Sequence, residues 1–139
     1  MPTLVGKITD HFSWHEAECH SKPPVPVPDE FRHNARNVCL ELEKIRRLCG
    51  AKPLTVTRIY STPQHNAAVG GAPHSHHLYA NAADILPPIK GMTARELAQV
   101  VYVLSQQADS RVRYIRAYGD DGHVHFDLRP RASVLTEGF

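Results

Sequence analysis

The sequence has no apolar run that approaches the ~18 residues of a membrane-spanning helix. Its opening, Met-Pro-Thr-Leu-Val-Gly-Lys, also lacks the basic and then apolar layout of a signal peptide. We therefore expect a soluble protein that is cytoplasmic as synthesised. The net charge of +2 is small and the Lys and Arg residues are dispersed, which argues against nucleic acid as the main partner.

Cysteine is scarce, with only Cys19, Cys39 and Cys49 in the chain. An odd number of cysteines without Cys-x-x-Cys spacing indicates neither a disulfide framework nor a zinc site made of thiolates. We expect buried free thiols in a reducing compartment, because free cysteine is among the most buried residue types. No feature of the sequence indicates an oligomer, so a monomer is the default expectation.

The remaining composition is that of an ordinary globular protein. Hydrophobic residues make up 42% of the chain and charged residues 22%, which argues against a disordered chain. With 139 residues the chain can bury a substantial core, and we expect residues 1–139 to form one domain. Histidine is the exception, because five of the ten histidines lie in the short segments 74–77 and 123–125.

The first third of the chain is predicted to be mostly helical. Ser13 and Glu16 form a capping box that begins a short helix. Residues 22–28 contain four prolines and are predicted to be extended, because each proline removes a backbone donor. Apolar residues at three- and four-residue intervals predict an amphipathic helix over 29–48. Its charged residues are expected on the solvated side: Glu41, Glu43, Lys44, Arg46 and Arg47.

A strand and a long loop are predicted next. Residues 54–60 are β-branched and alternating, which indicates a strand, and we place it at the centre of the sheet. Residues 61–76 contain proline and glycine and are predicted to be a loop. A loop of this length inside a compact domain tends to be functional.

The second half of the chain alternates strands with one helix. A short buried strand is predicted over 82–86, and a capping box at Thr93 begins a helix that runs to about Gln107. Residues 112–118 and 123–128 are predicted to form a hairpin. The tail from Pro130 onward has no clear pattern.

The two histidine-rich segments carry the candidate metal ligands. Successive side chains of a strand point to opposite faces, so His123, His125 and Asp127 share one face of the hairpin's second strand. The apolar residues between them then face the core. A catalytic zinc usually takes three protein ligands and leaves one position for water. His77, Asp84 and His125 could supply these three ligands.

Two sequence patterns connect these residues to a known family. Residues Ser75 to Asp84 read Ser-x-His-x-x-Ala-x-Ala-x-Asp, and His125 to Asp127 read His-x-Asp. This closely resembles the zinc D-Ala-D-Ala carboxypeptidase family, whose signature is Ser-x-His-x-x-Gly-x-Ala-x-Asp with His-x-Asp on a later strand. The family includes bacteriophage L-alanyl-D-glutamate endopeptidases and is related in fold to the hedgehog signalling domain. The resemblance implies an α+β fold with a small antiparallel sheet, helices on one side and a zinc site in a cleft on the sheet.

The resemblance also implies an activity. His77, Asp84 and His125 would bind one Zn²⁺, and a water at the open position would attack an amide bond in peptidoglycan stem peptides. Such an enzyme acts as a DD-carboxypeptidase or as an endolysin-like endopeptidase. The family places an acidic general base a few residues before the last zinc histidine. Asp120 and Asp121 are the candidates here, although neither has the spacing of three seen in several members.

Three further residues receive roles by the same resemblance. His123 matches a histidine that stabilises the oxyanion in some relatives. Asp127 is expected to orient a ligand or to pair with an arginine such as Arg129. Ser75 is expected to fix the loop at the substrate-binding side of the site.

The sequence departs from the family pattern at several positions. The family's Ser-Gly-Tyr-Arg-Ser-Pro reads Arg58-Ile-Tyr-Ser61-Thr-Pro here, so Ser61 replaces the arginine implied to bind the substrate carboxylate. Arg58 is a candidate substitute, although three residues on an extended strand separate the two positions by ~10 Å. Ala80 replaces the signature glycine, which matters if the backbone there needs a positive φ. His76 replaces the usual glutamine and is an additional ligand or an exposed residue.

Two hypotheses from different classes follow. The first is a zinc peptidase that cuts peptidoglycan stem peptides. The second is a non-catalytic zinc-binding module that binds cell-wall peptide or a protein partner, as in the hedgehog branch. A chain without an export signal would reach the cell wall through a phage lysis system, a virion or another secretion route.

Overall fold

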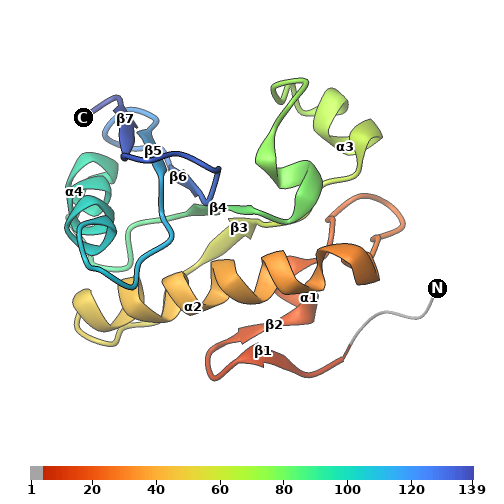
Figure 1. The fold of residues 1–139 in the computed structure, drawn as a ribbon, viewed down its shortest axis with the longest axis horizontal. Coiled ribbons are helices and arrows are strands. Elements are labelled where there is room, and N and C mark those ends of the chain that lie inside the picture. Colours follow the sequence, from red (N-terminus) through yellow and green to blue (C-terminus); the bar gives the residue numbers. More distant parts are fainter. Residues whose placement is uncertain (1–4) are drawn as a thin grey trace.

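The computed structural model describes residues 5–139 and has an α+β fold. A five-stranded sheet with the order β3-β4-β6-β5-β7 forms its centre, and a two-stranded sheet of β1 and β2 lies near the N-terminus (Figure 1). The strands are β1 (Lys7–Thr9), β2 (Phe12–Ser13), β3 (Val56–Arg58), β4 (Ala82–Ile85), β5 (Tyr114–Ala117), β6 (Val124–Asp127) and β7 (Leu135–Glu137). The helices are α1 (Trp14–Ala17), α2 (Arg32–Leu48), α3 (Pro63–Ala68) and α4 (Ala94–Ser105), with 3-10 helices η1 (Asp29–Phe31) and η2 (His76–Tyr79).

Helices α2 and α4 contact each other and pack against the central sheet, whereas α3 lies on the other side of the sheet (Figure 1). The predicted α+β class is confirmed. Helices α2 and α4 lie on one side of the sheet as expected, whereas α3 on the other side departs from that expectation. Alternation explains the core on the helix side, because Val124 and Phe126 of β6 are fully buried, as are Leu42 of α2 and Leu97 of α4. The site lies on the opposite face of the sheet.

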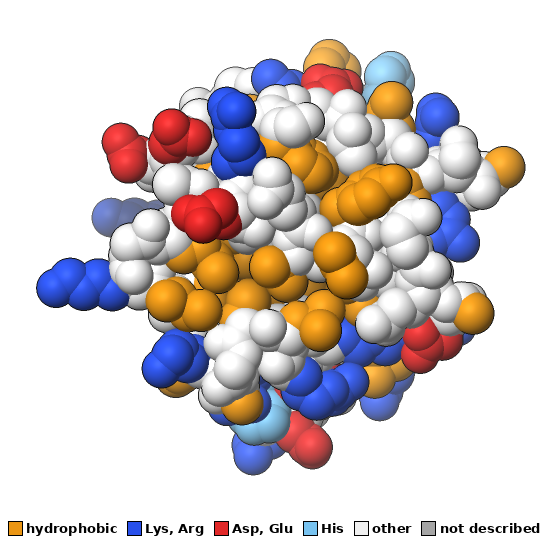
Figure 2. Space-filling view, turned by 90° about the vertical axis from the view of Figure 1, so that its left-hand side faces the viewer, with side chains coloured by type: hydrophobic (Ala, Val, Ile, Leu, Met, Phe, Trp, Pro, Cys, Tyr) orange, Lys and Arg blue, Asp and Glu red, His pale blue; other side chains and the backbone are white. Residues whose placement is uncertain are grey.

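Helix α4 covers one side of the molecule. Figure 2 shows that hydrophobic side chains gather near the middle of this side and charged side chains lie around them. Tyr102 and Val103 of α4 are among the exposed hydrophobic residues. None of the helices in residues 5–139 has the length and hydrophobicity needed to span a bilayer.

The sheet differs from the prediction at both edges. Strand β3 was expected at the centre but lies at an edge of the described sheet, where it pairs with β4, and it spans Val56–Arg58. Strand β7 was not predicted and pairs in parallel with β5, so the sheet is not purely antiparallel. Its sequence, Leu-Thr-Glu, is short and largely exposed, which leaves no alternating apolar pattern to detect.

Both predicted capping boxes are present. Ser13 and Glu16 cap α1, and Thr93 and Glu96 cap α4. Helix α3, within the predicted loop, was missed, although Thr62 accepts a hydrogen bond from the third helical residue and Pro63 follows it. A cap residue followed by proline is a helix-start signal that predicts this element.

Two acidic residues of α2 were wrongly expected on its solvated side. Glu41 is 1% exposed, and its Oε1 accepts hydrogen bonds from Oγ of Ser110 and the main-chain N–H of Arg111. Glu43 is 9% exposed, and its Oε2 accepts from Oγ1 of Thr9. These carboxylates tie α2 to segments far away in the sequence, and helical periodicity gives no indication of such donors.

Candidate metal centre

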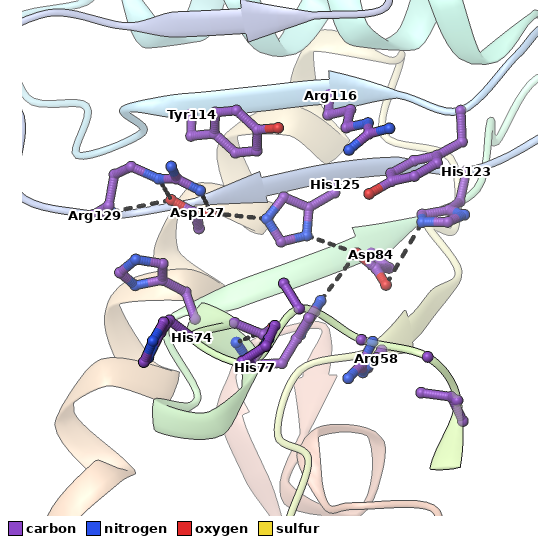
Figure 3. Close-up of a pocket in the computed structure, with 18 residues that line it drawn as sticks. Arg58, His74, His77, Asp84, Tyr114, Arg116, His123, His125, Asp127 and Arg129 are labelled. Carbon is purple, nitrogen blue, oxygen red and sulfur yellow. Dashed lines mark hydrogen bonds and ion pairs between the residues drawn. The ribbon is translucent and has the colours of Figure 1, made fainter. Parts of the chain in front are cut away.

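His77, Asp84 and His125 meet on the face of the sheet opposite α2 and α4 (Figure 3). His77 lies in η2, Asp84 in β4 and His125 in β6, where Asp84 and His125 are directly paired across the two strands. Oδ1 of Asp84 lies 3.1 Å from Nε2 of His77 and 3.0 Å from Nδ1 of His125. One potential ligand atom from each residue can be chosen so that all lie within 4.8 Å of one another.

The local sequence fixes His77. Oγ of Ser75 accepts a hydrogen bond from the main-chain N–H of His77 at 3.2 Å and caps η2. The main-chain oxygen of His77 accepts from the N–H of Ser61 at 3.0 Å. Helix η2 ends at Tyr79, and the next residue, Ala80, has a φ of 53°, so the position does need the left-handed conformation that the family's glycine adopts easily.

The hydrogen-bonding chemistry of the cluster fits a bound cation. Nδ1 of His77 lies 2.9 Å from the main-chain oxygen of Ile59, which can only accept, so Nδ1 carries the proton. A neutral His77 then directs the lone pair of Nε2 at a carboxylate oxygen of Asp84. Two lone pairs that face each other need a proton or a metal ion between them. Two imidazole nitrogens and a carboxylate oxygen form a donor set that suits zinc.

Asp127 and Arg129 form a second layer behind His125. Oδ2 of Asp127 accepts from Nε2 of His125 at 2.8 Å, which leaves Nδ1 of the same ring for a metal. Arg129 holds Asp127 with Nε at 2.7 Å from Oδ1 and Nη2 at 2.8 Å from Oδ2. This bidentate pair neutralises Asp127 and sets its orientation. The structure therefore contains both contacts that were expected of Asp127.

The charges of the cluster favour a cation. Burial opposes the ionised form of Asp84, but the adjacent imidazoles of His125 and His77 outweigh burial and hold the pKa of Asp84 well below its usual range. Burial also opposes the charged form of His125, whereas Asp127 and Asp84 together raise the pKa of His125 above its ordinary value. Negative charge thus remains at the site, and positive charge is stabilised between the two carboxylates.

The three side chains face a pocket of about 850 Å³. Residues 69–77 form one wall, and side chains of β5 and β6 form the other. Arg129 lies toward one end of the pocket, and Arg58 and His123 lie toward the other (Figure 3). The volume of the pocket falls within the range of ~300–1,000 Å³ that is typical of ligand sites in proteins.

The structure brings neither Asp120 nor Asp121 into this pocket. Both are exposed in the turn between β5 and β6, and neither lines the pocket. The main-chain oxygen of Asp120 accepts a hydrogen bond from the N–H of Ala94, and its carboxylate lies 3.8 Å from Nε of Arg95. The start of α4 therefore fixes the turn, and the Asp120 carboxylate points toward α4.

His123 does line the pocket, with Nε2 3.7 Å from Oδ2 of Asp84. Ser75 and His76 also line it. His76 lies outside the cluster of His77, Asp84 and His125. His123 is therefore the predicted catalytic residue that the structure places beside the cluster.

The side chain of Arg58 reaches position 61, which was not expected for an extended strand. Its Nε donates to Oγ of Ser61 at 2.7 Å, although ~10 Å of strand was expected to keep the two residues apart. The strand ends at Arg58, and the chain then turns, so the guanidinium folds over position 61. Arg58 lines the pocket, whereas Ser61 is fully buried and lies outside the lining.

Asn66 was missed in the sequence. Its Oδ1 accepts from Nη2 of Arg58 at 2.6 Å, and its Nδ2 donates to the main-chain oxygen of Ala72 at 2.9 Å. A Cβ at Gly71 would lie 2.1 Å from Oδ1 of Asn66, so glycine is required for this approach. One buried amide thus connects Arg58 to the loop that walls the pocket.

Tyr114, Arg116 and Tyr118 also line the pocket and were missed. They alternate along β5 and its end, which places them on the same face of the sheet as His123 and His125. The alternation rule that found the histidines on one strand of the hairpin finds these residues on the other.

The protein has an α+β fold, and two histidines and an aspartate lie at the floor of an open pocket on its central sheet. This arrangement is the one expected of a metallopeptidase domain. The family model described as Peptidase M15 matches residues 10–127, and the chain belongs to this family. The chain is also 36% identical over 63 residues to the zinc D-Ala-D-Ala carboxypeptidase of Streptomyces albus G. That match covers 45% of this chain and 25% of the relative, so it spans about a quarter of the relative's length.

Proposed function

We propose that this protein is a zinc peptidase that hydrolyses an amide bond in peptidoglycan stem peptides. The observation that carries the proposal is the cluster of His77, Asp84 and His125 at the floor of an open pocket. Membership of the peptidase M15 family and the similarity to a zinc D-Ala-D-Ala carboxypeptidase support the metal and the substrate class. The specific reaction is that of a DD-carboxypeptidase or an endolysin-like endopeptidase.

In this proposal, His77, Asp84 and His125 hold the zinc, and Asp127 keeps His125 in the tautomer that presents Nδ1. Zinc, when bound, polarises the scissile carbonyl and lowers the pKa of the attacking water. Arg129 keeps Asp127 ionised and in place, so the imidazole of His125 cannot rotate away.

We assign proton transfer or oxyanion stabilisation to His123, because its imidazole already lies beside Asp84 in the pocket. For Asp120 or Asp121 to act as the base, the turn would have to leave its contacts with α4. Two variants separate these roles. His123→Ala is expected to lower kcat by about 10²- to 10⁴-fold, and the double variant Asp120→Asn with Asp121→Asn is expected to retain activity. The opposite result would assign the base to the turn.

We assign recognition of a substrate carboxylate to Arg58. Its two hydrogen bonds within residues 5–139 go to the neutral oxygens of Ser61 and Asn66, so no carboxylate is hydrogen-bonded to it as Asp127 is to Arg129. Ser75 also lines the pocket. Arg58→Gln is expected to raise KM about ten- to a hundredfold, because a charge-assisted hydrogen bond is lost. Adding Ser61→Arg to Arg58→Ser should recover part of the loss, whereas no recovery would contradict the assignment.

Purified peptidoglycan tests the proposal. The protein is incubated with it, with and without a chelator, and new amino groups and free D-alanine are measured. We expect chelator-sensitive release that zinc restores. Free D-alanine would identify a carboxypeptidase, and new amino groups without it an endopeptidase.

A second function is favoured by one observation. Among residues 5–139, the carboxylates that line the pocket are those of Asp84 and Asp127, and both are engaged in the cluster. A pocket without a free acidic base suits a zinc-binding module that holds a cell-wall peptide or a protein partner without cleaving it. Zinc-dependent retention on peptidoglycan without release of amino groups or D-alanine would establish this function instead.

A further inference from the structure

His123 stacks on Tyr118 at one end of the pocket. The ring centroids lie 4.3 Å apart and the ring planes differ by 17°. The guanidinium carbon of Arg116 lies 4.5 Å from the centroid of the Tyr118 ring. Arg116, Tyr118 and His123 therefore form one column of planar groups, and Figure 3 shows Arg116 and His123 at the same end of the pocket.

The backbone holds this column tightly. The N–H of Tyr118 donates to the main-chain oxygen of His123 at 3.0 Å where the hairpin closes. A Cβ at Gly122 would lie 1.8 Å from the main-chain oxygen of Tyr118, so the turn has no room for a side chain at that position. The two stacked residues are thus fixed at their backbones as well as at their rings.

A second column backs His125 but is less important for holding it. Arg129 lies 3.8 Å from the Tyr114 ring, and Tyr114 meets His125 edge-on with centroids 5.6 Å apart. His125 is already held at both ring nitrogens, by Asp84 and Asp127. Its orientation is therefore set by hydrogen bonds rather than by the tyrosine.

His123 has no such hydrogen bonds among residues 5–139, and its nearest ionic contact is the 3.7 Å approach of Nε2 to Asp84. That distance is too long for a hydrogen bond. The plane of the ring is therefore set by packing. Tyr118 supplies that packing on the face of the ring, and aromatic stacking prefers a defined geometry.

We propose that Tyr118 is a positioning residue that holds the His123 imidazole with Nε2 directed at the Asp84 side of the cluster. The proposal deepens the proposed function, since it rests on His123 acting on the substrate. Tyr118 touches neither the cluster nor the scissile bond in this role. Its ring matters and its hydroxyl does not, so phenylalanine should replace it and alanine should not.

Nuclear magnetic resonance tests this inference without any activity. The ring signals of histidine are recorded on isotope-labelled, zinc-free and zinc-loaded protein, and His123→Gln assigns the His123 signals. In Tyr118→Ala, we expect the His123 ring signals to move while those of His77 and His125 stay in place. In Tyr118→Phe, all three are expected to match the wild type. Unchanged His123 signals in Tyr118→Ala, or equal movement of all three histidines, would overturn the proposal.

Kinetics provide the second test. Tyr118→Ala is expected to lower kcat about tenfold with KM and zinc content unchanged, because a small misplacement of a catalytic group slows the chemical step. Tyr118→Phe should restore the rate. In a His123→Ala background, Tyr118→Ala should cause no further loss, since Tyr118 acts through His123. An equal loss in that background, or loss of zinc, would show a general structural role.

The resonance and kinetic tests distinguish a failure of the Tyr118 proposal from a failure of the proposed function. A wild-type protein that releases nothing from peptidoglycan would contradict the proposed function, and the resonance experiment would still decide the role of Tyr118. Tyr118 is 41% exposed, so its truncation is expected to leave the fold intact. If Tyr118→Ala does not fold, Tyr118→Leu takes its place in both tests, because leucine keeps the apolar bulk and lacks the flat ring.

Discussion

The buried carboxylates of Glu41 and Asp84 lie in different parts of the molecule, and their surroundings differ. Glu41 on α2 accepts hydrogen bonds from Ser110, from the main-chain N–H of Arg111 and from Nζ of Lys44 at 2.9 Å. Among residues 5–139, the side-chain partners of the Asp84 carboxylate in the pocket are ring nitrogens of histidines: two at hydrogen-bonding distance and one farther away. The hydrogen-bonding capacity of the Glu41 carboxylate is therefore satisfied without a ligand. The Asp84 carboxylate instead requires either protonated imidazoles beside it or a bound cation.

The difference separates a structural role from a functional one. A carboxylate with main-chain, hydroxyl and lysine donors stabilises the fold and has no capacity left for a metal. A carboxylate surrounded by imidazoles shares its charge with groups that are themselves metal ligands. Variants at the two places should therefore change different properties of the protein.

The largest effect is expected at Asp84. Asp84→Asn removes the charged ligand and should abolish both zinc binding and peptidase activity, because two neutral imidazoles and an amide bind zinc poorly. The matched control is Glu43→Gln, another buried carboxylate changed to an amide, which should keep its zinc. Calorimetric titration of zinc into both variants checks this. A zinc affinity of Asp84→Asn close to that of the wild type would show that Asp84, like the buried carboxylates of α2, is not a metal ligand.

Glu41→Ala should have the next largest effect, on stability. It leaves the buried Ser110 hydroxyl and the neighbouring N–H without their acceptor, and we expect a loss of about 3 kcal/mol in the free energy of unfolding. Zinc content per folded chain should not change. Denaturant unfolding of zinc-free protein measures the loss. A destabilisation that disappears when zinc is added would instead link this residue to the metal centre.

Asp127→Asn should weaken zinc binding without abolishing it. The change removes the charged acceptor for Nε2 of His125 and the bidentate partner of Arg129, and such outer contacts are typically worth 10- to 100-fold in metal affinity. Asp109→Asn is the control, because Asp109 is exposed and lies on the α2 side. If the two variants bind zinc equally well, Asp127 does not contribute to the zinc affinity of the site.

The smallest effect is expected from pH at Glu43. Burial opposes ionisation, but hydrogen bonds from Thr9 and His11 lower the pKa of Glu43 below its ordinary value of 4.5. A lowered pKa in the folded state means that ionised Glu43 adds stability above pH 4.5, which is lost as pH falls through the folded-state pKa. The difference in unfolding free energy between wild-type and Glu43→Gln protein should therefore shrink in acid. A difference that stays constant with pH would mean that Glu43 is not preferentially ionised in the fold.

Much of the site could be predicted because its signals are local. Strand alternation alone placed His123, His125 and Asp127 on one face, and the structure agrees. Capping boxes located the starts of α1 and α4 for the same reason, since the partners lie within one helical turn.

The rest depended on contacts between distant segments. The burial of Glu41 requires Ser110, and the direction of Asp120 requires the start of α4. Arg58 was misjudged because distance was counted along a strand that ends at that residue. Strand β7 has no alternating apolar pattern of its own and is defined only by its pairing with β5.

The central claim is that His77, Asp84 and His125 bind one zinc ion. Metal analysis of protein purified without chelator tests it directly, with His77→Ala as the comparison, because removal of one of three ligands should prevent retention. The account predicts about one zinc per chain in the wild type and almost none in the variant. Equal zinc content in the two proteins would contradict it.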